Sequence, residues 1–160
     1  MPNWCEGTLK VRGEFERIKE FILKGLNVYS YIPLTGASIP TGGIKETEYS
    51  DDEYCEIDIS DIAYIEGTQR AFALKDTVHF YKREGKPSIV EIPIKQAWDM
   101  LACNFKAIAK KYNIDMHLFG FEQGGEFSRE IVIENGIIML DITKGYQDYK
   151  WDCPFSKLGG

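Results

Sequence analysis

Apolar and polar residues alternate at the start of the chain, which predicts a strand over residues 3–11. The two sides of this strand are Cys5, Leu9 and Val11 against Trp4, Glu6, Thr8 and Lys10. Phe15, Ile18 and Ile22 then recur at helical spacing, so we expect a helix over residues 14–24 that ends near Gly25. The chain therefore begins with a strand followed by an amphipathic helix.

The middle of the chain is less regular. Glycines and prolines are scattered over residues 26–53 without a period, which predicts an irregular insertion. Alternation returns over residues 54–59 and 77–83, and both segments are predicted strands. Residues 70–74 either extend the second of these strands or form a short helix. A proline within residues 89–94 indicates an edge strand or the lead-in to a helix.

The strongest helical pattern covers residues 95–112. Its apolar side chains are spaced three and four residues apart, which places them on one buried stripe. These are Trp98, Leu101, Phe105, Ile108 and Tyr112.

The last third of the chain reads as antiparallel strands. We expect strands over residues 114–122, 126–134 and 137–143. The pair Asn135-Gly136 is a strong signal for a two-residue hairpin between the second and the third. Residues 144–160 have no period, and we expect an extended tail that lies against the body.

The order of these elements predicts a fold of the α+β class. It matches a ferredoxin-like βαββαβ antiparallel sheet with two extra C-terminal strands, built as a single domain over residues 1–160. Both helices would pack on one face of the sheet. Trp4, Lys10, His79 and Tyr81 would then lie on the other face, which is open unless the insertion or the tail covers it.

Composition restricts the class of protein. The chain of 160 residues has a formal net charge of −6 and no apolar run as long as the ~20 residues that a membrane span needs. We therefore expect no membrane association and a cytoplasmic location. The four cysteines are isolated from one another, which disfavours both a disulfide framework and a zinc knuckle. No cofactor and no metal site are expected.

Negative charge is concentrated over residues 46–66, which contain nine carboxylates and no lysine or arginine. One interpretation is a solvated loop and strand face, and a second is a partner-binding surface that competes for a basic groove. A third is a site for a hard cation, which the absence of a calcium-loop spacing disfavours. The candidate partner-binding residues are Glu46, Glu48, Asp51, Asp52, Glu53, Glu56 and Asp58.

The sequence disfavours an enzyme. The chain has two histidines, each alone on a predicted strand, and no motif of a known hydrolase, zinc protease or dinucleotide-binding enzyme. No catalytic residue is assigned.

Two segments resemble a known family. They are MPNWCEGTLKVRG followed by EFERIKEFI, and KKYNIDMHLFGFEQGGEFSREIVIENG, in which Asn3, Trp4 and Cys5 combine with Glu122, Gly124 or Gly125, and Phe127. This combination resembles the YubB-type ferredoxin-like proteins, which include the Api92-like phage proteins. The resemblance implies a ferredoxin-like fold and a phage or plasmid setting, and with it the cytoplasm of a bacterial host. It implies no reaction.

Three functions remain open. The first is a non-enzymatic accessory protein of a mobile element that binds and inhibits a host protein, such as a nucleic-acid-binding defence protein, in the manner of an anti-CRISPR inhibitor. The second is a sponge that sequesters a nucleotide-derived immune signal, with Trp4, Arg70, Tyr81, Lys82, Arg83 and Trp151 as ligand-binding residues. The third is an RNA-binding module that stacks bases on aromatic residues of the open sheet face.

Overall fold

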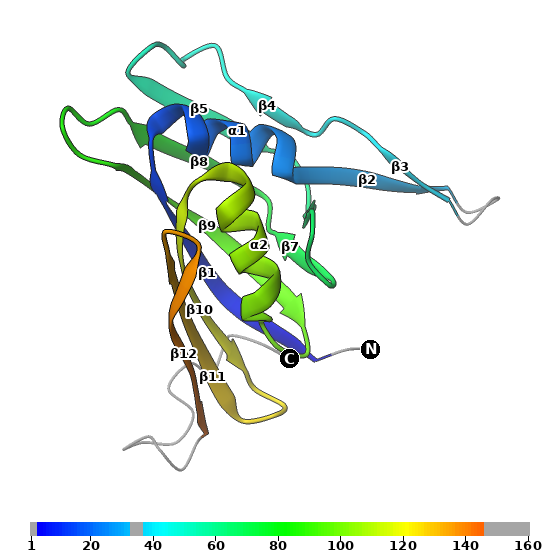
Figure 1. The fold of residues 1–160 in the computed structure, drawn as a ribbon. Helices are drawn as coiled ribbons and strands as arrows, with labels where there is room; N and C mark the ends of the chain where they lie inside the picture. Colours follow the sequence, from blue (N-terminus) through cyan, green and yellow to red (C-terminus); the bar gives the residue numbers. More distant parts are fainter. Residues whose placement is uncertain (1–2, 33–36, 146–160) are drawn as a thin grey trace.

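A computed structural model describes residues 3–32 and 37–145 of the chain (Figure 1). In these ranges it contains two helices and twelve strands. In chain order they are β1 (Trp4–Gly13), α1 (Phe15–Gly25), β2 (Leu26–Ile32), β3 (Ala37–Pro40), β4 (Ile44–Glu46), β5 (Tyr54–Ile59), β6 (Ala63–Ile65), β7 (Ala71–Ala73), β8 (Asp76–Tyr81), β9 (Ser88–Ala97), α2 (Ala102–Tyr112), β10 (Asp115–Glu122), β11 (Phe127–Glu134) and β12 (Ile137–Gly145).

The strands form two antiparallel sheets. The larger has nine strands in the order β12-β11-β10-β1-β9-β7-β6-β2-β3, and the smaller has three in the order β4-β5-β8. The two are joined where β8 turns back into β9, and there the hydroxyl of Ser88 donates to the carbonyl oxygen of Tyr81 at 2.6 Å. Figure 1 shows the smaller sheet beside α1 at the upper end of the molecule.

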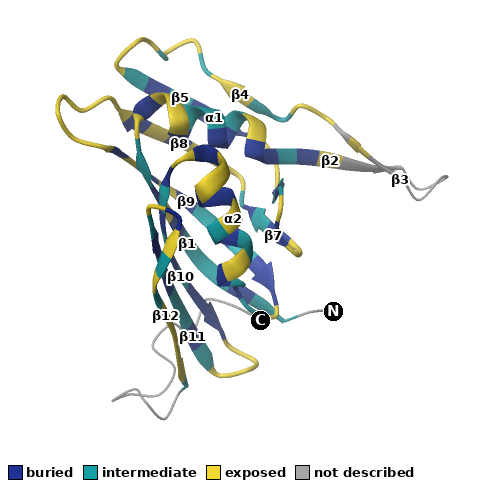
Figure 2. Cartoon of the chain, viewed as in Figure 1, coloured by how far each residue is buried: buried dark blue, intermediate teal, exposed yellow. Residues whose placement is uncertain are grey.

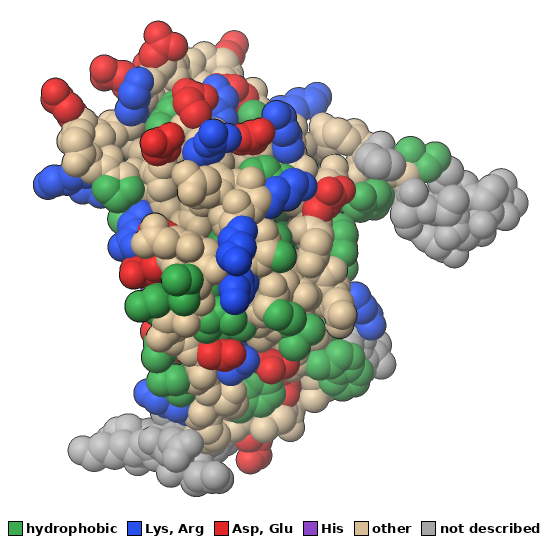
Figure 3. All heavy atoms as spheres, viewed as in Figure 1, with side chains coloured by type: hydrophobic (Ala, Val, Ile, Leu, Met, Phe, Trp, Pro, Cys, Tyr) green, Lys and Arg blue, Asp and Glu red, His purple; other side chains and the backbone are tan. Residues whose placement is uncertain are grey.

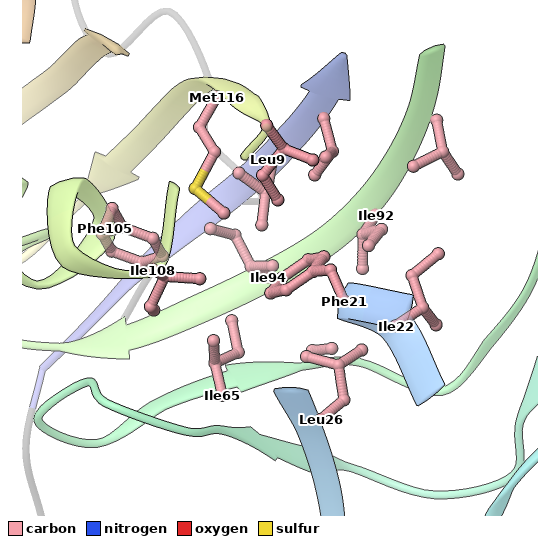
Figure 4. Close-up of a cluster of buried hydrophobic side chains, with 14 of the residues drawn as sticks. Leu9, Phe21, Ile22, Leu26, Ile65, Ile92, Ile94, Phe105, Ile108 and Met116 are labelled. Atoms are coloured by element: carbon pink, nitrogen blue, oxygen red, sulfur yellow. The ribbon is translucent and has the colours of Figure 1, made fainter. Parts of the chain in front are cut away.

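The core lies between the helices and the larger sheet. Both helices lie on the same face of that sheet, with their buried residues turned toward it (Figure 2). Figure 4 shows Phe21 and Phe105 from the two helices among Leu9, Ile92 and Ile94 from the sheet, all of them fully buried. Removing a buried phenylalanine ring typically costs about 3–5 kcal/mol, so these contacts fix the helices on the sheet.

The ferredoxin-like prediction is wrong. The described chain is mostly β, and β7 and β6 stand between β9 and β2 in the larger sheet. The predicted irregular insertion over residues 26–53 supplies β2, β3 and β4, although residues 33–36 lie outside the described residues. Leu26 and Val28 alternate into the core, which is a strand pattern that the neighbouring glycines and prolines obscured.

The predicted helix over residues 95–112 starts too early. Residues 88–97 form β9, a central strand paired with β1 and β7, and α2 begins at Ala102. Pro93 lies in this central strand although it has no backbone N–H. Its carbonyl oxygen accepts the N–H of Leu74, one residue past the last pair between β7 and β9. The side on which the N–H is missing is therefore one where the ladder has already ended, and proline is tolerated there. Trp98 is 59% exposed and does not belong to the buried helix stripe.

Several other elements are confirmed. The predicted segments near β1, α1, β5, β10, β11 and β12 form as expected, and 77–83 matches β8 within two residues at each end. Asn135 and Gly136 both have positive φ, 50° and 69°, as a two-residue hairpin requires. Residues 70–74 contain strand β7 and no helix, and β6 was not predicted. The tail predicted from residue 144 lies outside the described residues from 146 onward.

Candidate ligand-binding surface

The face of the larger sheet opposite the helices carries a row of aromatic rings from four strands. Trp4 of β1 contacts Phe72 of β7, Phe72 contacts Tyr64 of β6, and Tyr64 contacts Tyr29 of β2. The ring centres are 5.9, 5.9 and 6.3 Å apart, with each pair edge to face. We call Trp4, Phe72, Tyr64 and Tyr29 the aromatic row. Its rings are only partly buried, so they present apolar surface to solvent.

Alternation in the strands places this row. Cys5, Leu9 and Val11 of β1 point into the core and are fully buried, so Trp4 points to the opposite face. Phe72 stands directly opposite Tyr64 in the ladder between β7 and β6. Cross-strand aromatic pairs of this kind stabilise a sheet and fix its register.

Two cations lie against the first ring of the row. The ammonium of Lys95 is 4.6 Å from the centre of the Trp4 ring, and the guanidinium carbon of Arg70 is 6.0 Å from it. Within residues 3–32 and 37–145, neither side chain has an ion pair. A cation over an indole face interacts favourably with the ring and keeps donors to offer a ligand.

The cations farther along β1 are neutralised by neighbouring carboxylates. Lys10 pairs with Glu91 at 3.4 Å, and Arg12 pairs with both Asp115 and Glu134 at 2.8 Å. The two acceptors of Arg12 raise its pKa through hydrogen bonds. The charge that this face keeps for a ligand therefore lies at the Trp4 end.

The turn between β10 and β11 holds the start of β1 in place. The buried carboxylate of Glu122 accepts the backbone N–H of Gly124 at 2.7 Å and that of Gly125. A Cβ on Gly124 would lie 2.4 Å from the side-chain nitrogen of Asn3, so the turn packs closely against this residue. Asn3, Glu122, Gly124 and Gly125, which are among the residues that resemble the YubB-type proteins, thus lie together at one end of the sheet, next to Trp4.

The candidate acidic residues are spread over β4, β5 and the segment between them, and three of them bond within the protein. Glu46 pairs with Lys19 of α1 at 2.6 Å. Asp51 accepts the N–H groups of Glu53 and Tyr54, which lower its pKa. Glu56 accepts the hydroxyls of Thr47 and Tyr54 at 3.0 and 2.8 Å.

The other acidic candidates are Glu48, Asp52, Glu53 and Asp58, of which the first three are exposed. The backbone N–H of Lys82 donates to the backbone carbonyl oxygen of Glu53 at 2.7 Å, so a basic segment runs beside the acidic one. Figure 3 shows acidic and basic side chains intermixed at the upper end of the molecule, near α1 and the smaller sheet. On the face in that view, the negative charge is not continuous.

The six ligand-binding candidates do not form one site. Trp4 and Arg70 are brought together as described. Tyr81 is the last residue of β8 in the smaller sheet, with its ring 4.9 Å from that of Tyr54, and Lys82 and Arg83 lie in the segment that follows β8. His79, expected on the same face as Trp4, is also in the smaller sheet. Trp151 lies outside the described residues.

The thiols and imidazoles do not form a nucleophile pair in the described part of the chain. Cys5 is fully buried, and burial raises its pKa to about 12, so it is a protonated thiol at neutral pH. Burial also raises the pKa of Cys55. His117 lies 2.9 Å from Glu130, and His79 lies beside the Tyr54 ring. No group of three potential metal ligands occurs among the described residues.

Four members of this surface were missed from the sequence: Tyr29, which lies in the predicted irregular insertion, Phe72, Tyr64 and Lys95. The strands β6 and β7 are three residues long and too short for a periodic signal. Lys95 was assigned to a helix, although continuing the alternation of 89–94 by one residue puts it on the face opposite Ile94.

Comparison with family models, with curated proteins and with solved structures gives no match to this chain. The resemblance to YubB-type proteins therefore stays a prediction. In the described part of the chain, neither helix has the length and apolar character that crossing a membrane requires.

Proposed function

We propose that this is a non-catalytic binding protein whose open sheet face binds a ligand that carries a nucleobase and a phosphate. The observation that carries the proposal is the Trp4 ring with the ammonium of Lys95 4.6 Å from its centre, an ammonium that has no ion pair among the residues that the structure describes. A base that stacks on an aromatic side chain gains about 1–3 kcal/mol, and a nearby cation attracts the phosphate. Single-stranded RNA and a free nucleotide share this chemistry.

The charge of the surface limits the size of the ligand. Lys95 and Arg70 are the two cations at the Trp4 ring, and the chain as a whole has a net charge of −6. Each phosphate contact to a single strand contributes about −0.7 to the slope of log K against log salt, so two contacts predict a slope of about −1.4. This low value fits a short segment or a nucleotide better than a long backbone groove.

The experiment measures the affinity of the full chain for each ribonucleoside monophosphate and for short single-stranded RNA homopolymers, by calorimetry at several salt concentrations. Trp4→Leu removes the ring and keeps an apolar side chain, and Lys95→Gln removes one charge. Both should weaken binding at least tenfold, while Lys24→Gln, which removes the same charge from an exposed side chain of α1 that pairs with Glu20, should leave it unchanged. Binding by monophosphates alone assigns a nucleotide sponge, and binding by RNA alone assigns an RNA-binding module.

The proposal fails if neither probe binds the wild-type protein, or if Trp4→Leu and Lys95→Gln bind as tightly as Lys24→Gln. Thermal unfolding of each variant shows whether a loss of affinity comes from a loss of fold.

A second candidate is inhibition of a basic host protein, as expected of a phage or plasmid accessory protein. The observation in its favour is that Glu48, Asp52 and Glu53 are exposed and have no ion pair among the described residues. Complementary charge chiefly raises the association rate and the selectivity. The triple variant E48Q/D52N/E53Q should slow association with such a partner, recovered by pull-down, and reduce its salt dependence. Unchanged association kinetics would exclude the acidic surface.

A further inference from the structure

Two residues beside the aromatic row have a backbone conformation that their side chains disfavour. Trp98 has φ of 71° and Arg70 has φ of 58°. Within the described residues, Asn113, Glu126 and Asn135 also have positive φ, but they occupy a helix C-cap, the turn between β10 and β11 and a hairpin turn. Asparagine is well suited to this conformation, and Glu126 is the last residue of its turn. A bulky aromatic residue in this region is a genuine outlier and is retained only where the surrounding structure imposes it.

Hydrogen bonds from neighbouring segments hold Trp98 and Arg70 in this backbone conformation. The N–H of Trp98 donates to the carbonyl oxygen of Asn3 at 2.9 Å, and the N–H of Ala97 donates to that of Arg70 at 3.1 Å. The fully buried Gln96 ties the two loops together, because its amide donates to Gln69 at 3.1 Å and accepts from Leu101 at 3.4 Å. The backbone is thus held rigidly on both sides.

The strained loops line one pocket. It has a volume of about 190 Å³ and is lined by Gln69, Arg70, Ala97, Trp98, Asp99 and Leu101. The ring of Trp98 is 59% exposed, so neither core packing nor burial accounts for a tryptophan here. Arg70 belongs both to this pocket and to the surroundings of Trp4, 6.0 Å from its ring centre. The pocket therefore adjoins the aromatic row.

We propose that Trp98 and Arg70 form a rigid clamp for one nucleobase, next to the base that Trp4 receives. The inference rests on the proposed function, because it assigns a second base position to the same ligand. Indole and guanidinium are both planar groups that stack on bases. Gln69 lines the same pocket and can accept or donate hydrogen bonds at the edge of the base. The carboxylate of Asp99, which also lines it, already pairs with Arg129 at 3.2 Å and accepts the N–H of Met100 at 2.7 Å. A clamp that is already in place loses little conformational freedom when the ligand binds.

The first measurement tests the strain. Trp98→Gly and Trp98→Ala both remove the ring, but only alanine keeps a Cβ at positive φ. Trp98→Gly should therefore unfold at a higher urea concentration than Trp98→Ala. Tyr49 is the matched control, since it is 69% exposed and is not among the residues with positive φ. There the order should be reversed, because glycine at ordinary φ is less stable than alanine.

The second measurement tests the clamp, with whichever probe the wild-type protein binds, a monophosphate or a homopolymer. Trp98→Gly should lose about tenfold or more in affinity, the usual contribution of one stacked base, and Tyr49→Gly should lose none. The clamp predicts that Trp98→Gly is more stable than Trp98→Ala and binds the probe more weakly than the wild-type protein. A purely structural role for Trp98 does not produce this combination.

Three outcomes overturn the proposal. If Trp98→Gly is no more stable than Trp98→Ala, the backbone there is not strained. If the wild-type protein binds, Trp4→Leu weakens binding and Trp98→Gly does not, the clamp is wrong while the proposed function stands. If neither probe binds the wild-type protein, the proposed function fails and the clamp with it.

Discussion

Replacing Glu122 by glutamine tests whether the turn between β10 and β11 positions the ligand surface. Glu122 is 2% exposed, and its two carboxylate oxygens accept the N–H groups of Gly124 and Gly125. Glutamine has nearly the same shape, but it offers one acceptor oxygen and turns an NH₂ group toward the other N–H. One of the two backbone donors then loses its acceptor within the protein.

The expected cost follows from these two bonds. A hydrogen bond to a charged group contributes about 1.5–3 kcal/mol, and the remaining bond weakens when its acceptor becomes neutral. Burying a neutral amide instead of a carboxylate offsets part of the loss. We expect Glu122→Gln to lower the free energy of unfolding by about 2 kcal/mol. Because Gly124 packs on Asn3, ligand affinity at Trp4 should fall as well.

Urea denaturation followed by circular dichroism measures the loss of stability, and calorimetry measures the affinity. Glu126→Gln is the matched control, since Glu126 lies in the same turn, is exposed, and has no hydrogen bond through its side chain among the described residues. If the two variants are equally stable, the carboxylate of Glu122 does not hold the turn, and the account of the Trp4 end is wrong.

Three further predictions concern the sheet and its ionisable groups. Gly7→Ala should cost about 3 kcal/mol or prevent folding, because its Cβ would lie 1.9 Å from a backbone carbonyl oxygen of β10 that cannot move aside; a midpoint of urea unfolding equal to that of wild type would contradict the register. Alkylation at neutral pH, mapped by mass spectrometry, should label the exposed Cys103 and spare the buried Cys5 until the protein is unfolded; labelling of native Cys5 would refute its burial. The hydrogen bond to Glu56 raises the pKa of Tyr54 from 10.0 to about 12, so this bond stabilises the fold fully below pH 10 and the contribution is lost as pH rises toward 12. In a spectrophotometric titration Tyr54→Phe should remove a tyrosine that ionises near pH 12, and loss of one that ionises near pH 10 would exclude the bond.

Local patterns predicted the elements whose own residues determine their conformation. The strand from Trp4 alternates cleanly, and Asn135-Gly136 requires a tight turn wherever its strands pair. The order of strands in the sheet depends instead on distant segments, and no local pattern placed β6 and β7 between β9 and β2. The fold class was missed for this reason.

The boundary between β9 and α2 shows how two periods compete. The apolar residues of the segment fit a helix from Trp98 onward, whereas Ile92, Ile94 and Gln96 continue the alternation of a buried strand. Gln96 is polar although it is buried, so the hydrophobic pattern treats its position as exposed and ends the strand before it. Its two bonds to neighbouring loops compensate for burial, and those bonds appear only when the loops have met.

The sequence likewise predicted only part of the candidate site. Alternation placed Trp4 on the open face, but its partners arrive through pairings of β1 with β9 and of β9 with β7. The acidic residues were visible in the sequence as a run of charge, yet three of the seven are used within the protein by Lys19, by backbone N–H groups and by hydroxyls. Charge along a sequence is therefore a weaker guide here than the pairing of each charge in space.

The aromatic row is the more rigid of the two candidate surfaces, which favours it as the binding site. Trp4 and Lys95 lie on β1 and β9, which are paired along ten residues in the centre of the larger sheet. Glu48, Asp52 and Glu53 lie in the segment between β4 and β5, where side chains lose conformational freedom when a partner orders them. Binding on a surface that is already ordered avoids this cost, so equal contact areas give higher affinity at Trp4. A flat ligand that contacts both Trp4 and the pocket beside Arg70 binds on ordered backbone at both positions, so its binding costs little conformational freedom of the protein.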